Sequence, residues 1–323
     1  MLSDWGIVES DGDTLYLGKG SFEYDLITPL FSDYAHKLRT VHIPEGKTPR
    51  LGADGDVIEF PVGTIISKTF YYPAGAGENE VLKLSASLTA SEGKLNISEL
   101  HLIETRLLVR RDDGWDALPY VWNEQQTRAE LKRAGDIKKL TLVEGDAKSE
   151  FAYLVPDANQ CSGCHATNNT TREIVPIGPK IRHLQDSSLF NVSAPEPVFR
   201  NVDWTDQSAG LNDRARAYLD INCSHCHSRV GPADTSGLHL EPTTVLGPNL
   251  GICKTPIAAG TGTGNRKYGI IPGQPENSIF TFRMASTNPA IMMPELGRSL
   301  SHEEGVALIE DWISSLEGQC NTG

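Results

Sequence analysis

The sequence predicts an α+β protein, in which a β-rich N-terminal domain over residues 1–155 is followed by a mostly α-helical C-terminal part. Two observations lead to this prediction. Before residue 156, β-branched and aromatic runs alternate with glycine- and proline-containing turns, as is typical of strands. After it, several segments carry apolar residues at the spacing of one helix face.

The strand predictions depend on turn signals between apolar runs. The stretch DVIEFPVGTIISKTFYY is rich in β-branched and aromatic residues and is punctuated by Pro61 and Gly63. Two further runs flank Asp113–Gly114, a dipeptide typical of hairpin turns, and another pair flanks Gly145. One interruption, NEQQTRAELKRAG, ends at Gly135 as a helix would.

Three helices are predicted later in the chain. The first, LNDRARAYLDIN, places Leu211 and Leu219 near one face. The second, PENSIFTFRMAS, begins with Pro275, a residue typical of the first helical turn. In the third, SHEEGVALIEDWISSL, Ser301 precedes Glu304 by three residues, which is the capping-box pattern.

Composition and charge limit the classes of partner. The formal net charge of -13 and the pI near 5.1 argue against nucleic acid or an anionic membrane surface, both of which would repel the protein. No apolar run is long enough to cross a bilayer. The opening MLSDWGIVES lacks the features of a secretion signal, so we expect a mature or trimmed chain whose membrane association would need an anchor lost from this sequence.

The residues most suited to chemistry form two C-x-x-C-H motifs. They are Cys161, Cys164 and His165, and Cys223, Cys226 and His227. Two thiols at this spacing can add to the vinyl groups of one haem, and the histidine that follows can bind its iron. Redox-active thiols would need a βαβ setting, and a zinc site would need two cysteine pairs to meet across some sixty residues. The motifs therefore predict two covalently bound haem c groups.

A methionine is the expected distal ligand of the second haem. Apart from the initiator, every methionine lies in one stretch: Met284, Met292 and Met293. Residues 208–323 contain a helix, the second motif, a loop that carries methionines (IMMPELGRSL, the methionine loop) and a closing helix. This is the order of a cytochrome c-like domain. We expect Met293 to bind the iron because Pro294 stiffens this position, with Met292 as the alternative, and we expect Met284 to pack in the core.

The first haem has no obvious distal ligand, because the segment 156–207 is too short for a complete domain. His183 follows a Gly-Pro turn and is the nearest candidate in sequence. An open iron site is a further possibility. The other candidates are Met284, Met292, His36, His42 and His101.

Two cysteines lie outside the motifs. Cys253 and Cys320 bracket the methionine loop, and we expect a disulfide between them, with free buried thiols as the alternative. A disulfide and covalent haem attachment both belong to an oxidising, extracytoplasmic compartment.

Several stretches resemble a family of little-characterised bacterial dihaem c-type cytochromes with an N-terminal β-rich region. They are DLITPLFSDYAHK, ETRLLVRRDDGWDALPYVWNEQQT, the two motifs and, most specifically, PGQPENSIFTFRMASTNPAIMMPELGRSLSHEEGVALIEDWI. The resemblance covers most of the chain. It implies a periplasmic or cell-surface location, two covalently bound haems, His165 and His227 as proximal ligands, and a methionine of IMMPELG as the second distal ligand.

The favoured function is electron transfer between redox protein partners outside the cytoplasm. The alternative is a dihaem peroxidase-like oxidoreductase with one open haem site, which would need acid-base groups near that iron. The sequence offers no clear set of such groups. The β-rich half could also fix the protein within an oligomer or larger assembly.

Overall fold

The computed structural model describes residues 1–84, 93–192 and 199–320. The chain divides into two compact units, each built from several stretches of sequence. Unit 1 comprises Met1–Leu26, Tyr34–Ser162 and Ile174–Val198. Unit 2 comprises Ile27–Asp33, Gly163–Glu173 and Phe199–Gly323.

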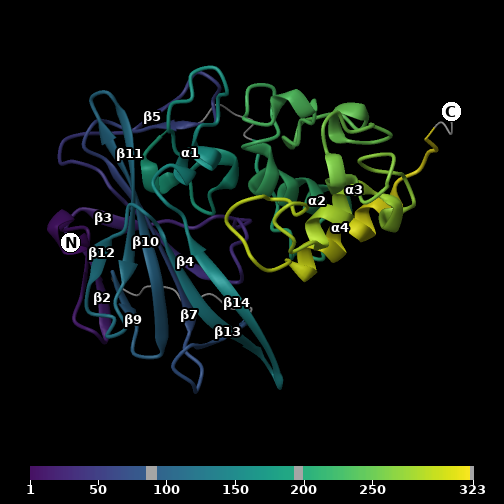
Figure 1. The fold of residues 1–323 in the computed structure, drawn as a ribbon. Coiled ribbons are helices and arrows are strands. Elements are labelled where there is room, and N and C mark those ends of the chain that lie inside the picture. The colour runs from purple at the N-terminus through teal and green to yellow at the C-terminus, as the bar shows by residue number, and fades with distance from the viewer. Residues whose placement is uncertain (85–92, 193–198, 321–323) are drawn as a thin grey trace. The chain divides into compact units, whose positions relative to one another are not determined.

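The centre of unit 1 is an antiparallel sheet in which β10 lies between β7 and β11 (Figure 1). Its strand order is β12-β11-β10-β7-β4-β3. The strands are β3 (Ser21–Glu23), β4 (His36–His42), β7 (Ile65–Pro73), β10 (Leu100–Arg111), β11 (Gly114–Trp122) and β12 (Ala129–Leu131). The predicted turn at Asp113–Gly114 is confirmed, since Arg111 pairs with Gly114 at the end of the β10–β11 hairpin.

Three smaller sheets complete the strands of the described residues. Two are three-stranded, with the orders β1-β2-β9 and β14-β13-β8, and one is the pair β5-β6. Their strands are β1 (Val8–Ser10), β2 (Thr14–Leu17), β5 (Arg50–Leu51), β6 (Ile58–Glu59), β8 (Glu80–Leu82), β9 (Lys94–Asn96), β13 (Asp136–Glu144) and β14 (Ala147–Val155).

Both faces of the central sheet are buried, and neighbouring residues of a strand point to opposite faces. On one face, Leu38 and Tyr71 belong to a core with Trp122. On the other, Val41 and Ile66 pack in a second core. A sheet covered on both sides can therefore hold different groups at fixed positions on each face.

Unit 2 is built around helices α2 (Leu211–Leu219) and α4 (Glu303–Ser315). Their shared core includes Trp312, which is fully buried and donates from Nε1 to Asn212 Oδ1 at 3.2 Å. Helix α3 (Ile279–Ala285) is shorter, and α1 (Gln160–His165) spans the change from unit 1 to unit 2 along the chain. No described helix has the length and apolar character that a membrane span requires.

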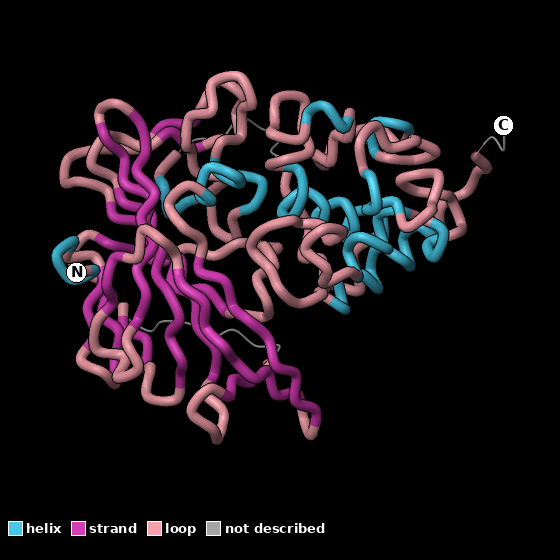
Figure 2. The backbone as a smooth tube through the Cα atoms, viewed as in Figure 1, coloured by secondary structure: helices cyan, strands magenta, loops and turns pink. Residues whose placement is uncertain are grey.

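The predicted fold class is wrong in its C-terminal part, which is not the mostly α-helical cytochrome c-like domain that we expected. Within the described residues after 207, α-helix is confined to α2, α3 and α4, of 9, 7 and 13 residues, and loops make up most of the rest (Figure 2). The three helices themselves were predicted. Glycine and proline recur throughout the connecting sequence, and neither sustains a helix interior.

The predicted helix over NEQQTRAELKRAG is also wrong. This stretch forms a turn followed by β12, which pairs with β11. The side-chain oxygen of Asn123 accepts hydrogen bonds from the backbone of Thr127 and Arg128, which closes the turn. Local capping and pairing with β11 thus outweigh the helical propensity of the sequence.

Cys253 and Cys320 form a disulfide across 67 residues of sequence. Replacing both with alanine should lower the free energy of unfolding by about 4 kcal/mol, because the reduced chain gains freedom in its unfolded state. Urea unfolding followed by tryptophan fluorescence measures the loss. Reduced wild-type protein is the control, and its free energy of unfolding should match that of the double variant. If reduction left the free energy of unfolding of the wild-type protein unchanged, the expectation would be wrong.

Candidate functional site

Helix α2 leads directly into the second C-x-x-C-H motif through a π-helical turn, Asp220–Ser224. Ser224 Oγ lies 2.7 Å from both the backbone oxygen and Oδ1 of Asp220, which fixes the turn. The backbone N–H groups of Cys226 and His227 then donate to the carbonyl of Cys223 at 3.1 and 2.9 Å. The motif is therefore an ordered turn at the end of a packed helix.

His227 has the orientation of a metal-binding histidine. Its Nδ1 lies 3.2 Å from Ser236 Oγ, and that hydroxyl donates its own proton to Ala233 O at 2.6 Å. With that hydrogen used, Ser236 Oγ accepts a hydrogen bond from the Nδ1–H group of His227, and in this tautomer the lone pair is on Nε2. Burial and the nearby Arg283 lower the pKa of His227 to about 4, so the ring is neutral at pH 7. A histidine held through one nitrogen binds a metal through the other.

The two cysteines of this motif are half-buried thiols. Burial is the main cause that raises the pKa of both Cys223 and Cys226 to about 12. Both are therefore protonated at neutral pH and differ from the low-pKa thiolates typical of redox-active C-x-x-C sites.

A buried arginine holds the methionine loop. Arg298 is only 4% exposed, and its Nη2 donates to the carbonyls of Met293, Ser286 and Arg283 at 2.9, 2.9 and 3.2 Å. Its Nη1 donates to the carbonyl of Leu300 at 3.0 Å. One guanidinium thus joins the end of α3 to both sides of the loop.

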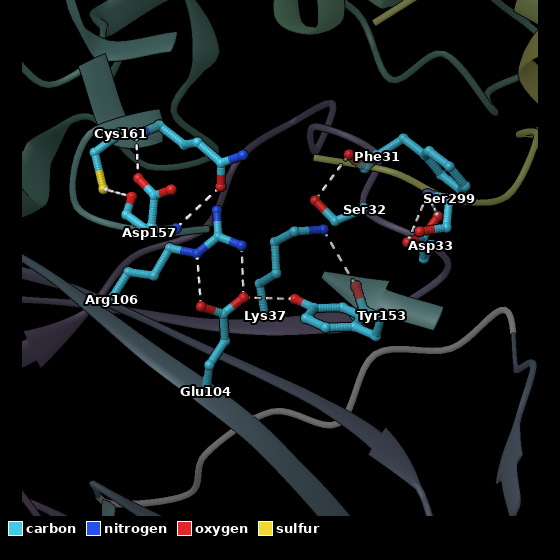
Figure 3. A network of polar contacts seen from close by, with 12 residues as sticks. Phe31, Ser32, Asp33, Lys37, Glu104, Arg106, Tyr153, Asp157, Cys161 and Ser299 are labelled. Carbon is cyan, nitrogen blue, oxygen red and sulfur yellow. Dashed lines mark hydrogen bonds and ion pairs between the residues drawn. The ribbon is translucent and has the colours of Figure 1, made fainter. Parts of the chain in front are cut away.

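Asp33 fixes the chain just after Arg298 (Figure 3). Its Oδ1 accepts the backbone N–H groups of Ser299 and Leu300 at 2.8 and 2.7 Å, and Oδ2 lies 2.9 Å from the first of these nitrogens. Asp33 is buried, and the two N–H bonds compensate the cost of placing a carboxylate there.

The methionine loop approaches the second motif. The charge of Glu295 contributes to the raised pKa of Cys226, and that of Arg298 partly offsets the rise at Cys223. Met293, two residues before Glu295, is half-buried. The structure thus brings the loop of the predicted distal ligand close to the cysteines of the motif.

The other two methionines have different surroundings. Met292 is 5% exposed, and Met284 packs against the core of α2 and α4, as expected. The choice of Met293 over Met292 as iron ligand stays a prediction.

The first motif forms the short helix α1. Asp157 caps it: Oδ1 accepts the N–H groups of Asn159 and Gln160 at 2.7 and 2.8 Å, and Gln160 Oε1 accepts the Asp157 N–H at 3.0 Å. Cys161 Sγ lies 3.5 Å from the Asp157 carbonyl (Figure 3). This reciprocal cap fixes the start of the motif. Cys161 belongs to unit 1, and Cys164 and His165 belong to unit 2.

In unit 1, Cys161 lies near a buried ion pair (Figure 3). Glu104 is 0% exposed, accepts two hydrogen bonds from Arg106 at 2.8 and 2.5 Å, and accepts another from the Tyr153 hydroxyl at 2.8 Å. Burial alone would lower the pKa of Arg106, but the Glu104 carboxylate outweighs this effect and raises it. Arg106 therefore remains a fixed positive charge beside Cys161.

His183 lies on the face of the central sheet that carries Arg106. It is 3% exposed, in the turn Ile181–His183. Its neighbours Ile181 and Leu184 belong to the core that includes Leu108, two residues from Arg106 on the same strand. This placement is compatible with the predicted role at the first haem, which stays a prediction.

The strand histidines divide between the two faces. His36 and His42 pair with Tyr71 and Ile65, on the face opposite Arg106. His101 pairs with Tyr72 and lies on the face of Arg106. The alternation argues against His36 and His42 as ligands of a haem bound to Cys161.

The donors of the second motif are compatible with a haem. Among the described residues, no group of three or more His, Cys, Asp and Glu side chains is arranged to hold a metal ion. A haem iron takes four nitrogens from its porphyrin, so it needs only one or two protein ligands. Two protonated thiols followed by a neutral, oriented imidazole meet that need.

Sequence reasoning missed Arg298, Asp33, Glu104 and Arg106. Each is an isolated charged residue with no motif around it, and its role depends on groups that meet only in the fold. Comparisons with protein-family models, curated proteins and solved structures give no match for this chain.

Arg298→Met should lower the free energy of unfolding by roughly 3 kcal/mol, because buried carbonyls lose a charged donor. Arg266→Met is the matched control. Arg266 is a half-buried arginine that donates to the carbonyls of Glu276 at 3.0 Å, in an exposed bond, and of Gly264 at 3.2 Å, and its guanidinium lies 4.2 Å from the centre of the Phe282 ring. Its loss should stay within about 1 kcal/mol. Denaturant unfolding measures both changes. If the two variants lost the same free energy of unfolding, the buried bonds of Arg298 would not contribute the extra stability expected here.

Proposed function

We propose that this protein is a dihaem c-type cytochrome that transfers electrons between redox protein partners outside the cytoplasm. The term c-type refers here to covalent haem attachment and not to a fold. The observation that carries the proposal is the second motif, in which Cys223 and Cys226 precede a histidine whose Nδ1 is bonded to Ser236. The first motif repeats the same residue types at the same spacing.

Each residue of the second motif has a role in this proposal. Cys223 and Cys226 would hold the haem through thioether bonds, and His227 Nε2 would bind the iron. Met293 is the proposed second protein ligand of that iron, and Arg298 holds its backbone. The bound haem supplies an iron that accepts or donates one electron at a time.

At the first site, Cys161, Cys164 and His165 take the corresponding roles, with His183 as the proposed distal ligand. The burial of His183 on the same sheet face as Arg106 supports its proposed role as distal ligand of the first haem.

The setting and the partners follow from charge and cysteine chemistry. The disulfide Cys253–Cys320 supports an oxidising location such as the periplasm or the cell surface. The net charge of -13 favours a redox partner with a basic docking surface. Association with such a partner should weaken as ionic strength rises.

Protein made with a working haem-maturation system should carry two covalently bound haems, seen as two haem masses in intact mass spectrometry. The Cys161→Ala/Cys164→Ala and Cys223→Ala/Cys226→Ala variants should each retain one. Optical spectra should show low-spin iron that neither reacts with peroxide nor binds carbon monoxide. A bare polypeptide mass would refute the proposal, and a high-spin iron that reacts with peroxide would favour a peroxidase-like enzyme instead.

Met293→Ala should lower the reduction potential of the second haem and remove its methionine-to-iron absorption, because the thioether ligand favours the reduced iron. Met292→Ala is the matched control, since it removes the adjacent thioether but not the proposed ligand. Spectroelectrochemistry measures both effects. If only Met292→Ala changes the spectrum, the ligand assignment moves to that residue.

A further inference from the structure

The two C-x-x-C-H motifs, separated by about sixty residues of sequence, meet within unit 2. Cys226 Sγ lies 3.8 Å from the backbone oxygen of Gly163, the residue before Cys164. The last thiol of the second motif is thus in contact with the chain that carries the last thiol of the first. Nothing in the spacing of the sequence predicts this contact.

Further contacts fix the same arrangement. The backbone N–H of Asn169 donates to Val230 O at 2.6 Å, and its side chain lies 3.4 Å from Asp234 Oδ1. The chain after the first motif is therefore bonded to the loop after the second. Asn169 thus joins the chain after the first motif to two residues of the loop after the second, Val230 and Asp234.

The methionine loop closes on the same point. A Cβ atom added to Gly163 would lie 2.9 Å from Leu296 Cδ1, so this leucine covers the first motif at Gly163. Gly163, Cys226 and the methionine loop therefore converge in one place.

We infer that the two haems form an electronically coupled pair, in which the porphyrin edge bound through Cys164 lies next to the edge bound through Cys226. The inference rests on the proposed function and adds to it the relation between the two sites. A thioether bond places the porphyrin edge directly at the sulfur atom, so neighbouring cysteines bring two porphyrin edges together.

The coupling concerns a simple exchange. Haems held through Cys164 and Cys226 would allow one electron to pass from a ferrous to a ferric iron, with no bond made or broken and no proton moved. Electron tunnelling falls steeply with the distance between edges, so this exchange should be faster than exchange with a partner protein. A donor bound at one haem can then supply an acceptor bound at the other.

Charge adds a second effect. Reducing one iron lowers the positive charge near the other, and this interaction strengthens as the distance between them decreases. The second electron should therefore enter at a lower potential than it would in a protein with one haem. Magnetic coupling between two ferric irons at short range gives an independent sign of the same proximity.

The test uses wild-type protein with both haems, followed by electron paramagnetic resonance through a redox titration. With both irons ferric, their signals should be broadened or split by mutual coupling. When the first iron becomes ferrous and diamagnetic, the signal of the second should sharpen. Signals that keep their shape and vanish independently would overturn the inference.

Single-haem variants give a second readout. Cys161→Ala/Cys164→Ala removes the first haem, and Cys223→Ala/Cys226→Ala removes the second. In each variant, the remaining haem should titrate as one simple wave at a potential shifted from its value in the pair, while wild-type protein should not fit the sum of the two variants. Circular dichroism checks that both variants fold, and the wild-type titration decides the question if either does not.

The outcomes separate the two proposals. Two bound haems whose spectra and potentials add without interaction would overturn the coupled pair and leave the proposed function intact. A protein that binds no haem under maturation conditions would overturn both.

Discussion

The convergence of four carbonyl groups on the guanidinium of Arg298 is the interaction on which the order of unit 2 depends most directly. Loops without regular secondary structure leave backbone oxygens unpaired, and burying such oxygens is costly. One planar cation with several N–H groups satisfies many of them from a single position. A region poor in helix can therefore hold a loop in place without extending a helix or strand.

The same principle recurs elsewhere in unit 2. Arg216, which is also buried, donates from one nitrogen to the carbonyls of Glu241, Pro242 and Thr244. Asp33 plays the opposite part, because its carboxylate accepts backbone N–H groups. Buried charges thus replace regular hydrogen-bond ladders, and each one is matched by backbone dipoles of the opposite sign.

The sequence predicted what depends on local pattern. The hairpin at Asp113–Gly114, the three later helices and the pair Cys253–Cys320 could be read from turn chemistry, helical spacing and cysteine position. The helix content of the C-terminal part was overestimated, because three amphipathic segments do not indicate the structure of the segments between them. The stretch before Gly135 was mistaken for a helix because pairing with β11 cannot be seen locally. The meeting of Gly163 with Cys226 is a tertiary contact that no spacing encodes.

The Ser236 hydroxyl beside His227 has a consequence for electronic tuning. A carboxylate in that place would draw the Nδ1 proton strongly and give the imidazole partial anionic character, so that it would push electron density onto a metal at Nε2 and stabilise the oxidised state. A neutral hydroxyl attracts the Nδ1 proton much more weakly than a carboxylate does. The ring therefore behaves as a modest σ-donor, and an iron bound to it would sit toward the oxidising end of the range open to histidine-ligated centres.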